Sequence, residues 1–456
     1  MRLVSQRQRS LVFYQSLPSY TQEWEKIALI LDASPSINAL AWSDLHTDRG
    51  GQPKKATGAK GMSAEQVIRF AVVKIKERLS YRDLKDRVAD SICLRAFCLV
   101  DYDDVPAFTT LQENIKKIRA ATWKAINAAV VQYACDQGVE DGECVRIDTT
   151  AVKTNIHHPT DSHQLWDGNR VLARILQRIE GDFERLYGAF HNHHRATKRL
   201  FYRIHNTRGE DNKKPLYKRL IAYTEKTVGY ARVAREALRP ERCASFEEIL
   251  IAAGYVSELD RFIPLVEQVI DQSRRRVLLG EKVPANEKIV SIFEPHTDII
   301  KKGQREIIYG HKVLLTGGRS NLITDCAIEP GNPADAVQFI PAIGRQEQQF
   351  GQCPRQVATD AGFASAANAR EARDKGVENL MFACARKKDA PENNHDSKVY
   401  KRLRKWRSGI EGVISATKRA FGLDRCTWSG FESFKAYVQI AVLAFNLQTL
   451  ARHLLA

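Results

Sequence analysis

Three charged residues near the C-terminal end have types and spacing that suit chemistry on phosphate groups. Arg407 and Glu411 are four residues apart, and Lys418 follows Glu411 by seven. On a helix, which turns by 100° per residue, this spacing places all three side chains along one line. The segment 404–422 therefore predicts a helix with one carboxylate between two cations. Taken alone, the pattern is more typical of an ion pair on an ordinary amphipathic helix.

Two aspartates elsewhere change that interpretation. Asp148 lies in the segment CVRIDTTAV (144–152), whose β-branched residues predict a short strand. Asp360 ends a second predicted strand (356–359) and precedes a tight turn at Gly362. Ligand sites in open α/β sheets gather at the ends of strands, so we expect both aspartates to meet Glu411 at one face of a sheet.

Three carboxylates that meet in this way repel one another unless a divalent cation binds between them. Oxygen ligands of this kind favour Mg²⁺ or Mn²⁺. A pair of such ions activates a water or a 3′-hydroxyl and stabilises the leaving oxygen of a phosphodiester. The acidic residues therefore predict a metal-dependent reaction on a nucleic acid.

The composition agrees with a nucleic-acid partner. The formal net charge is +16, and a surplus of this size is typical of proteins that bind polyanions. A membrane partner is not expected, because the apolar runs Leu11–Tyr14 and Ile440–Phe445 are too short for a signal peptide or a membrane span. The nine cysteines are scattered without a CxxC pair, which indicates neither a disulfide framework nor a structural zinc site and favours a reducing cytoplasm.

The remaining elements predict several domains. Residues 1–60 have no clear period and are interpreted as an N-terminal arm that ends in a basic, glycine-rich linker from Asp48 to Gly61. Helical spacing after Ser63 predicts an all-α domain of three to five helices (61–140), for DNA binding or self-association. A long helical block (161–285) follows the first strand. Further predicted strands are 288–293, 311–316, 322–328 and 379–383, with a hairpin turn at Gly317-Gly318, and further predicted helices are 335–343 and 365–375.

This ordered set resembles the DDE transposases of bacterial insertion sequences. Asp148 in IDTTAV matches the first aspartate of the family, and Asp360 in TDAGF matches the second, which lies in a TDxGF motif. Arg407, Glu411 and Lys418 match the third motif of one large branch, Tyr-x2-Arg-x3-Glu-x6-Lys, with Arg404 at the position of the tyrosine. The resemblance covers roughly residues 60 to 455 and includes the stretches 79–91, 291–303, 310–318 and 329–335.

The resemblance implies an α/β RNase H-like catalytic core, a mixed sheet flanked by helices, formed by residues 141–160 and 286–456. The helical block 161–285 is then an insertion within that core. The implied activity is DNA cleavage at the ends of an insertion sequence, followed by strand transfer into target DNA. Asp148, Asp360 and Glu411 would bind two Mg²⁺ or Mn²⁺ ions. The implied partners are double-stranded DNA, both terminal inverted repeats and target DNA, and a second copy of the chain in a homodimer at the bacterial nucleoid.

Basic residues near Glu411 are expected to bind the DNA backbone. Arg407 and Lys418 would hold phosphates beside the scissile bond. The other candidates share the basic segment before Glu411: Lys401, Arg402, Arg404 and Lys405. Two other functions are compatible with the sequence, namely a metal-dependent nuclease without strand transfer and a DNA-binding protein that has lost catalysis.

Histidines and tryptophans give weaker signals. His191 and His194 are three residues apart, but without cysteine or carboxylate partners nearby a solvated or phosphate-facing cluster is favoured over a transition-metal site. The pair His157-His158 follows the first strand and is not assigned to the active site. Trp406 and Trp428 are expected to pack in the core rather than to stack on bases.

Overall fold

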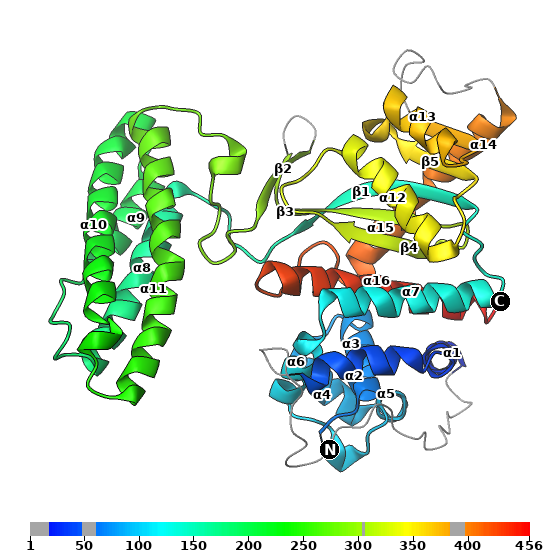
Figure 1. The fold of residues 1–456 in the computed structure, drawn as a ribbon, viewed down its shortest axis with the longest axis horizontal. Helices are drawn as coiled ribbons and strands as arrows, with labels where there is room; N and C mark the ends of the chain where they lie inside the picture. The colour runs from blue at the N-terminus through cyan, green and yellow to red at the C-terminus, as the bar shows by residue number, and fades with distance from the viewer. Residues whose placement is uncertain (1–17, 48–60, 303–305, 384–396) are drawn as a thin grey trace. The chain divides into compact units, whose positions relative to one another are not determined.

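A computed structural model describes residues 18–47, 61–302, 306–383 and 397–456 (Figure 1). The predicted linker from Asp48 to Gly61, except Gly61 itself, and most of the loop before the C-terminal helices lie outside these residues. The chain divides into two compact units, one of residues up to Thr154 and from His311 onward, and one of Asn155–Gly310. None of the described helices combines the length and the apolar character needed to cross a membrane.

A mixed sheet has the strand order β2-β3-β1-β5-β6, with β4 paired to β3. Strands β1, β4, β5 and β6 and the part of β3 from His311 onward belong to the first unit, whereas β2 and the start of β3 fall within the second. Strands β1, β5 and β6 are parallel, whereas β2, β3 and β4 are antiparallel. The strands are β1 (Cys144–Lys153), β2 (Asp298–Lys302), β3 (Glu306–Gly317), β4 (Ile323–Ile328), β5 (Gln356–Asp360) and β6 (Asn379–Ala383). The predicted α/β class is confirmed at the level of a mixed sheet flanked by helices.

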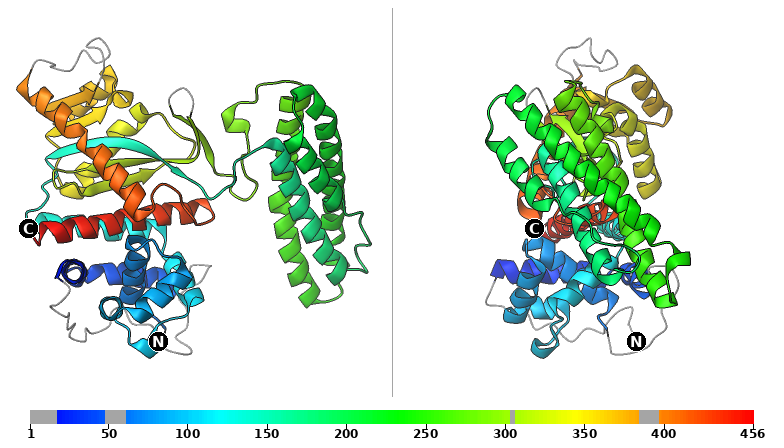
Figure 2. Two further views of the ribbon diagram at one scale, coloured as in Figure 1. Left: turned by 180° about the vertical axis from the view of Figure 1, so that it is seen from behind. Right: turned by 90° about the vertical axis from the view of Figure 1, so that its left-hand side faces the viewer.

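Helices cover both faces of this sheet. Helices α12 (Asp335–Phe350) and α13 (Ala366–Asp374) pack on one face through a core that contains Val145, Val357 and Phe339. Helix α14 (Lys398–Arg407) packs on the opposite face through Tyr400 and Leu403, as the view from behind shows (Figure 2). Helix α15 (Gly409–Phe421) follows α14 directly and contacts β1.

The N-terminal helices of the first unit share one apolar core with the long C-terminal helix α16 (Phe431–His453), which is buried along most of its length. They are α1 (Pro18–Asp32), α2 (Ser36–His46), α3 (Ala64–Lys76), α4 (Tyr81–Asp90), α5 (Ile92–Cys98), α6 (Phe108–Lys117) and α7 (Ala120–Asp136). Ser63 caps α3 through a reciprocal pair of hydrogen bonds with Gln66, as the sequence predicts. Helices α1 and α2 occupy a segment for which no helix was expected, and Trp24 and Ile27 of α1 are fully buried.

The second unit is a bundle with its own apolar core (Figure 1). Its helices are α8 (Asp161–Asp182), α9 (His194–Asn206), α10 (Glu210–Ala237) and α11 (Phe246–Ser273). They confirm the helical period predicted after the first strand. The domain boundaries inferred from the sequence stay predictions.

Two strand assignments differ from the sequence-based expectation. Residues 288–293 do not form a strand, because their backbone groups bond to glutamine side chains: Gln272 donates to the Ile289 carbonyl and accepts from its N–H, and Gln164 accepts from the Ile292 N–H. Strand β2, in contrast, was not predicted and pairs with the first half of β3. The predicted hairpin at Gly317-Gly318 joins β3 to β4 as expected.

Candidate active site

Asp148 and Asp360 are brought together by the pairing of two parallel strands. The register of β1 and β5 places Arg146 opposite Ala358 and Ile147 opposite Thr359. The next residues on the two strands are Asp148 and Asp360, so they are neighbours. A register shift of one residue would turn one of the two carboxylates to the other face of the sheet.

The alternation of side chains along β1 decides which face carries the carboxylates. Val145 and Ile147 point into the core beneath α12 and α13, whereas Cys144 packs against α14. Since neighbouring side chains of a strand point to opposite faces, Asp148 shares the face of Cys144, which is the face that α14 covers. The same reasoning applies to Asp360, two residues after Ala358 of that face.

Arg407 lies among all three acidic residues that the sequence singled out. Its Nη1 atom is 3.7 Å from Oδ2 of Asp148 and 3.8 Å from Oδ1 of Asp360. Its Nη2 atom donates to Oε1 of Glu411 over 2.7 Å. Carboxylates from β1, β5 and α15 therefore converge on one guanidinium, although residues 148 and 411 are far apart in the chain.

The site is closed on the sheet side and open on the other. The side chains of Asp148 and Arg407 are only 16% and 15% exposed, whereas those of Asp360 and Glu411 are 53% and 61% exposed. The carboxylates of Asp360 and Glu411 are therefore accessible to solvent.

The pKa of Asp148 is raised mainly because its carboxyl group is buried. The pKa is raised to about 6, because burial and, to a smaller extent, the charges of Asp360 and Glu411 outweigh the lowering effects of the Thr149 N–H and of Arg407. A cation placed beside this carboxylate would therefore stabilise its ionised form.

The donor set fits a divalent metal such as Mg²⁺, because all three side chains offer carboxylate oxygens. The oxygens are arranged around the guanidinium of Arg407 and do not all lie within 4.8 Å of one another, unlike a histidine-containing cluster in the second unit. A bound cation would therefore take over the neutralising role of Arg407.

Arg146 is a positioning residue that sequence reasoning missed. Its buried guanidinium donates to the Trp406 carbonyl over 3.0 Å, lies over the Trp406 ring and contacts Asn321. It thereby ties the end of α14 to β1, two residues before Asp148. A cation inside the otherwise apolar run CVRI is the signal that could have revealed it.

The predicted helix 404–422 is interrupted at Ser408. Helix α14 ends at Arg407 and α15 begins at Gly409. At this point the Trp406 carbonyl accepts a hydrogen bond from Arg146. A Cβ atom on Gly409 would lie 2.3 Å from Nη1 of Arg146, so the close approach of the arginine requires glycine here. The break is local, so the contact between Arg407 and Glu411 survives it.

The predicted phosphate-binding residues fall into two groups. Lys401, Arg402, Arg404 and Lys405 are exposed on α14. Lys418, in contrast, points to β1, where its Nζ atom donates to the Ala151 carbonyl over 2.8 Å. Lys418 therefore also holds α15 against the strand that carries Asp148.

The other residues weighed in the sequence pack in a core of the first unit or belong to the second unit. Trp428 is buried in the main core, and Trp406 packs at the edge of the α14 core, which confirms their packing role. His157 belongs to the second unit, where its ring stacks on that of His163.

Comparison with known proteins supplies one match. No curated protein and no solved structure matches the chain. The family described as "Transposase DDE domain" matches residues 289–447, a segment that contains Asp360 and Glu411 and begins after Asp148. Residues 289–447 are therefore similar to the transposase DDE domain.

Proposed function

We propose that this protein is an insertion-sequence transposase that cleaves DNA at the ends of its element and transfers the released strand into target DNA. The convergence of Asp148, Asp360 and Glu411 on the guanidinium of Arg407 carries the proposal. Three carboxylates from separate elements around one cation at an open surface suit phosphodiester chemistry better than a structural ion pair. The mixed sheet with β1 near its centre supports an RNase H-like core.

The three carboxylates would hold Mg²⁺ or Mn²⁺, expected as a pair. When bound, such ions activate the attacking water or 3′-hydroxyl and neutralise charge on the phosphate. Asp148 supplies the most buried oxygens, and Asp360 and Glu411 supply oxygens that face the solvent from which DNA arrives.

Arg407 has two tasks in this proposal. In the free protein its guanidinium offsets the repulsion among the carboxylates. Once divalent cations take over that task, the guanidinium is available for a phosphate oxygen, which it can bind through two N–H groups. The exposed cations of α14 would hold the DNA backbone next to it, and Lys418 would keep α15 in place beside β1.

The proposed partners are the terminal inverted repeats, target DNA and a second copy of the chain. Joining two element ends needs two sites, so we propose a homodimer. The N-terminal helices (61–140) would contribute to DNA binding or to self-association, and the helical block 161–285 would be an insertion in the catalytic domain.

The test uses the full-length protein and a DNA fragment that carries the sequences flanking its gene. With Mg²⁺, the wild type should cleave this fragment, and precut ends should be joined to a plasmid. Asp148→Asn, Asp360→Asn and Glu411→Gln should abolish both reactions while leaving DNA affinity within about twofold, because none of them removes a cation.

The outcomes separate the alternatives. Cleavage without joining of precut ends would identify a nuclease, and DNA binding without any metal-dependent cleavage would identify a protein that has lost catalysis. Full activity of Glu411→Gln would show that the assignment of the triad is wrong.

A further inference from the structure

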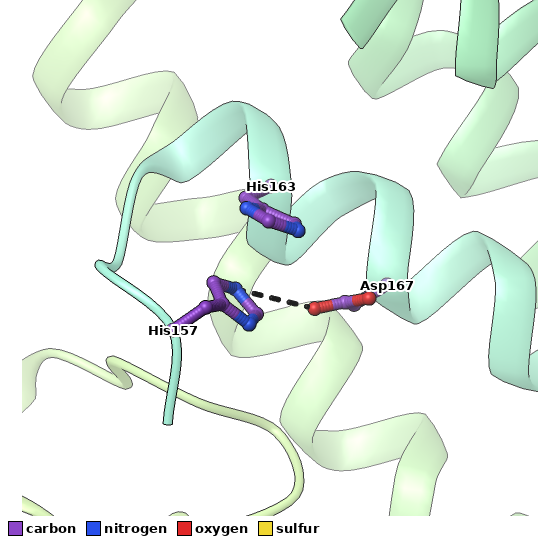
Figure 3. Close-up of side chains that lie close together, drawn as sticks. All are labelled: His157, His163 and Asp167. Carbon is purple, nitrogen blue, oxygen red and sulfur yellow. Dashed lines mark ion pairs between the residues drawn. The ribbon is translucent and has the colours of Figure 1, made fainter. Parts of the chain in front are cut away.

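The second unit contains a cluster of side chains that the proposed reaction does not use. His157 lies in the segment between β1 and α8, and His163 and Asp167 lie four residues apart on α8, so both face the same side of that helix. Figure 3 shows the three side chains turned toward one another. Within the described part of the chain, this is the group of histidine, cysteine and acidic side chains whose ligand atoms all lie within 4.8 Å of one another.

Two atoms of the cluster face each other without a hydrogen bond. Nε2 of His157 and Oδ2 of Asp167 are both buried and have no hydrogen-bond partner. They lie 3.5 Å apart, which is long for a hydrogen bond. Two ligands of a tetrahedral zinc ion, each about 2.0 Å from the metal, lie about 3.3 Å apart. The observed separation therefore fits a metal ion bound by both atoms.

Asp167 is held in an orientation in which one carboxylate oxygen has no hydrogen bond. The residue is only 1% exposed, and Nη2 of Arg170 donates to its Oδ1 atom over 2.8 Å. Arg170 in turn packs on the rings of Trp166 and Phe293. Metal-binding carboxylates are commonly held in this way, with a second residue bonded to the oxygen that does not bind the ion. The other oxygen has only the long contact with His157, and a buried carboxylate oxygen without a hydrogen bond is otherwise unfavourable.

The histidines are held in a form that can bind a cation. The His163 ring stacks on that of His157 at 3.6 Å between centroids and contacts Phe201 at 4.9 Å. Burial lowers the pKa of both imidazoles, that of His163 to about 4, so both rings are neutral and keep a lone pair at neutral pH. The side chain of His157 is 36% exposed, so the cluster lies near the protein surface.

We propose that His157, His163 and Asp167 form a binding site for one divalent transition-metal ion of the Zn²⁺ type, with water completing its coordination. Two imidazoles and a carboxylate are softer donors than the three carboxylates of the proposed active site, so the two sites select different metals. The ion would fasten the segment after β1 to the start of α8, which makes it a structural element of the second unit. This proposal does not depend on the reaction catalysed at the acidic triad.

The experiment uses Co²⁺ as a visible probe for the full-length protein after treatment with a chelator. One equivalent of Co²⁺ should give the visible absorption of a low-symmetry site, and Zn²⁺ should displace it. Asp148→Asn, which alters the acidic triad, should leave this absorption unchanged. His163→Phe keeps a ring against Phe201 and removes the ligand nitrogen, and it should weaken Co²⁺ affinity at least about 100-fold. His205→Phe, at an exposed position of α9, is the matched control and should bind as the wild type does.

Several results would overturn the proposal. They are the absence of Co²⁺ absorption in folded wild-type protein, unchanged binding by His163→Phe, or loss of the absorption in Asp148→Asn. If circular dichroism shows that His163→Phe does not fold, the wild type and Asp148→Asn still decide the question. Zinc content after purification, measured by mass spectrometry, should be one per chain in the wild type and in His205→Phe.

Discussion

Asp148→Asn tests the electrostatics of the proposed active site without any substrate. Burial raises the pKa of Asp148 from 3.8 to about 6. At neutral pH the ionised carboxylate therefore has a higher free energy in the folded protein than in the unfolded chain, which lowers the free energy of unfolding. Asparagine resembles the protonated acid in shape and can still accept the Thr149 N–H bond. The variant should therefore be more stable than the wild type, although it should be inactive.

The magnitude follows from the shift in pKa. A difference of about two units corresponds to roughly 3 kcal/mol at pH 7.5. Because the pKa of Asp148 is higher in the folded protein, the protonated acid favours folding and the ionised form opposes it. The contribution of Asp148 to the free energy of unfolding is therefore fully present below pH 3.8 and is lost as the pH rises through 6. The gain from Asp148→Asn should therefore shrink to about half at pH 5, because the wild type then regains its proton.

Urea unfolding followed by tryptophan fluorescence gives the free energy of unfolding. Five of the six tryptophans lie in the unit that contains Asp148, so the signal reports mainly on that unit. Asp360→Asn is the matched control, because the Asp360 side chain is 53% exposed and keeps much of its water. We expect little stabilisation from the control. Added Mg²⁺ should stabilise the wild type and narrow its difference from Asp148→Asn.

The reasoning would be refuted if Asp148→Asn were less stable than the wild type at pH 7.5. The same holds for a stability gain that does not depend on pH between 5 and 7.5. Either result would mean that Arg407 and the Thr149 N–H compensate the buried charge fully.

Three further predictions concern the elements around the triad. Gly409→Ala places a methyl group 2.3 Å from Nη1 of Arg146, so we expect a loss of about 1–3 kcal/mol in urea unfolding and slower cleavage with unchanged DNA affinity. Lys418→Met removes the hydrogen bond from α15 to β1, and the free energy of unfolding should fall by about 1 kcal/mol; an unchanged value would show that this bond does not hold α15 in place. The double variant with Arg404→Gln and Lys405→Gln should bind DNA more weakly in fluorescence anisotropy. The slope of log affinity against log salt concentration should fall by about 0.9 for each phosphate that the variant no longer neutralises. An unchanged slope would exclude both residues from the DNA interface.

Local patterns made much of the architecture predictable from the sequence. The β-branched run around Asp148 and the short strand before Asp360 form β1 and β5 as expected. The capping residue Ser63 starts α3, and the Gly317-Gly318 turn joins β3 to β4. Each of these features depends on neighbouring residues only, so period and propensity are sufficient to find it.

Features that depend on distant partners were not predictable. The segment 288–293 has the composition of a strand, yet Gln272 and Gln164 satisfy its backbone groups from α11 and α8. Helix α1 was missed because its burial depends on α16, at the other end of the chain. The hydrogen bond from Arg146 to the Trp406 carbonyl could not be predicted, because the two residues are distant in the sequence.

The sequence by itself determined which residues could act together: a carboxylate four residues from an arginine on a helix, two strand aspartates, and a surplus of positive charge. Only the tertiary structure decided that Arg407 contacts all three carboxylates and that Lys418 points to β1. It also decided that His157 meets Asp167. The physical reason is that the spacing of residues along one helix or strand fixes the directions of their side chains relative to one another. Contacts between elements depend instead on strand register and on packing across the sheet, and the order of residues in the sequence does not specify these.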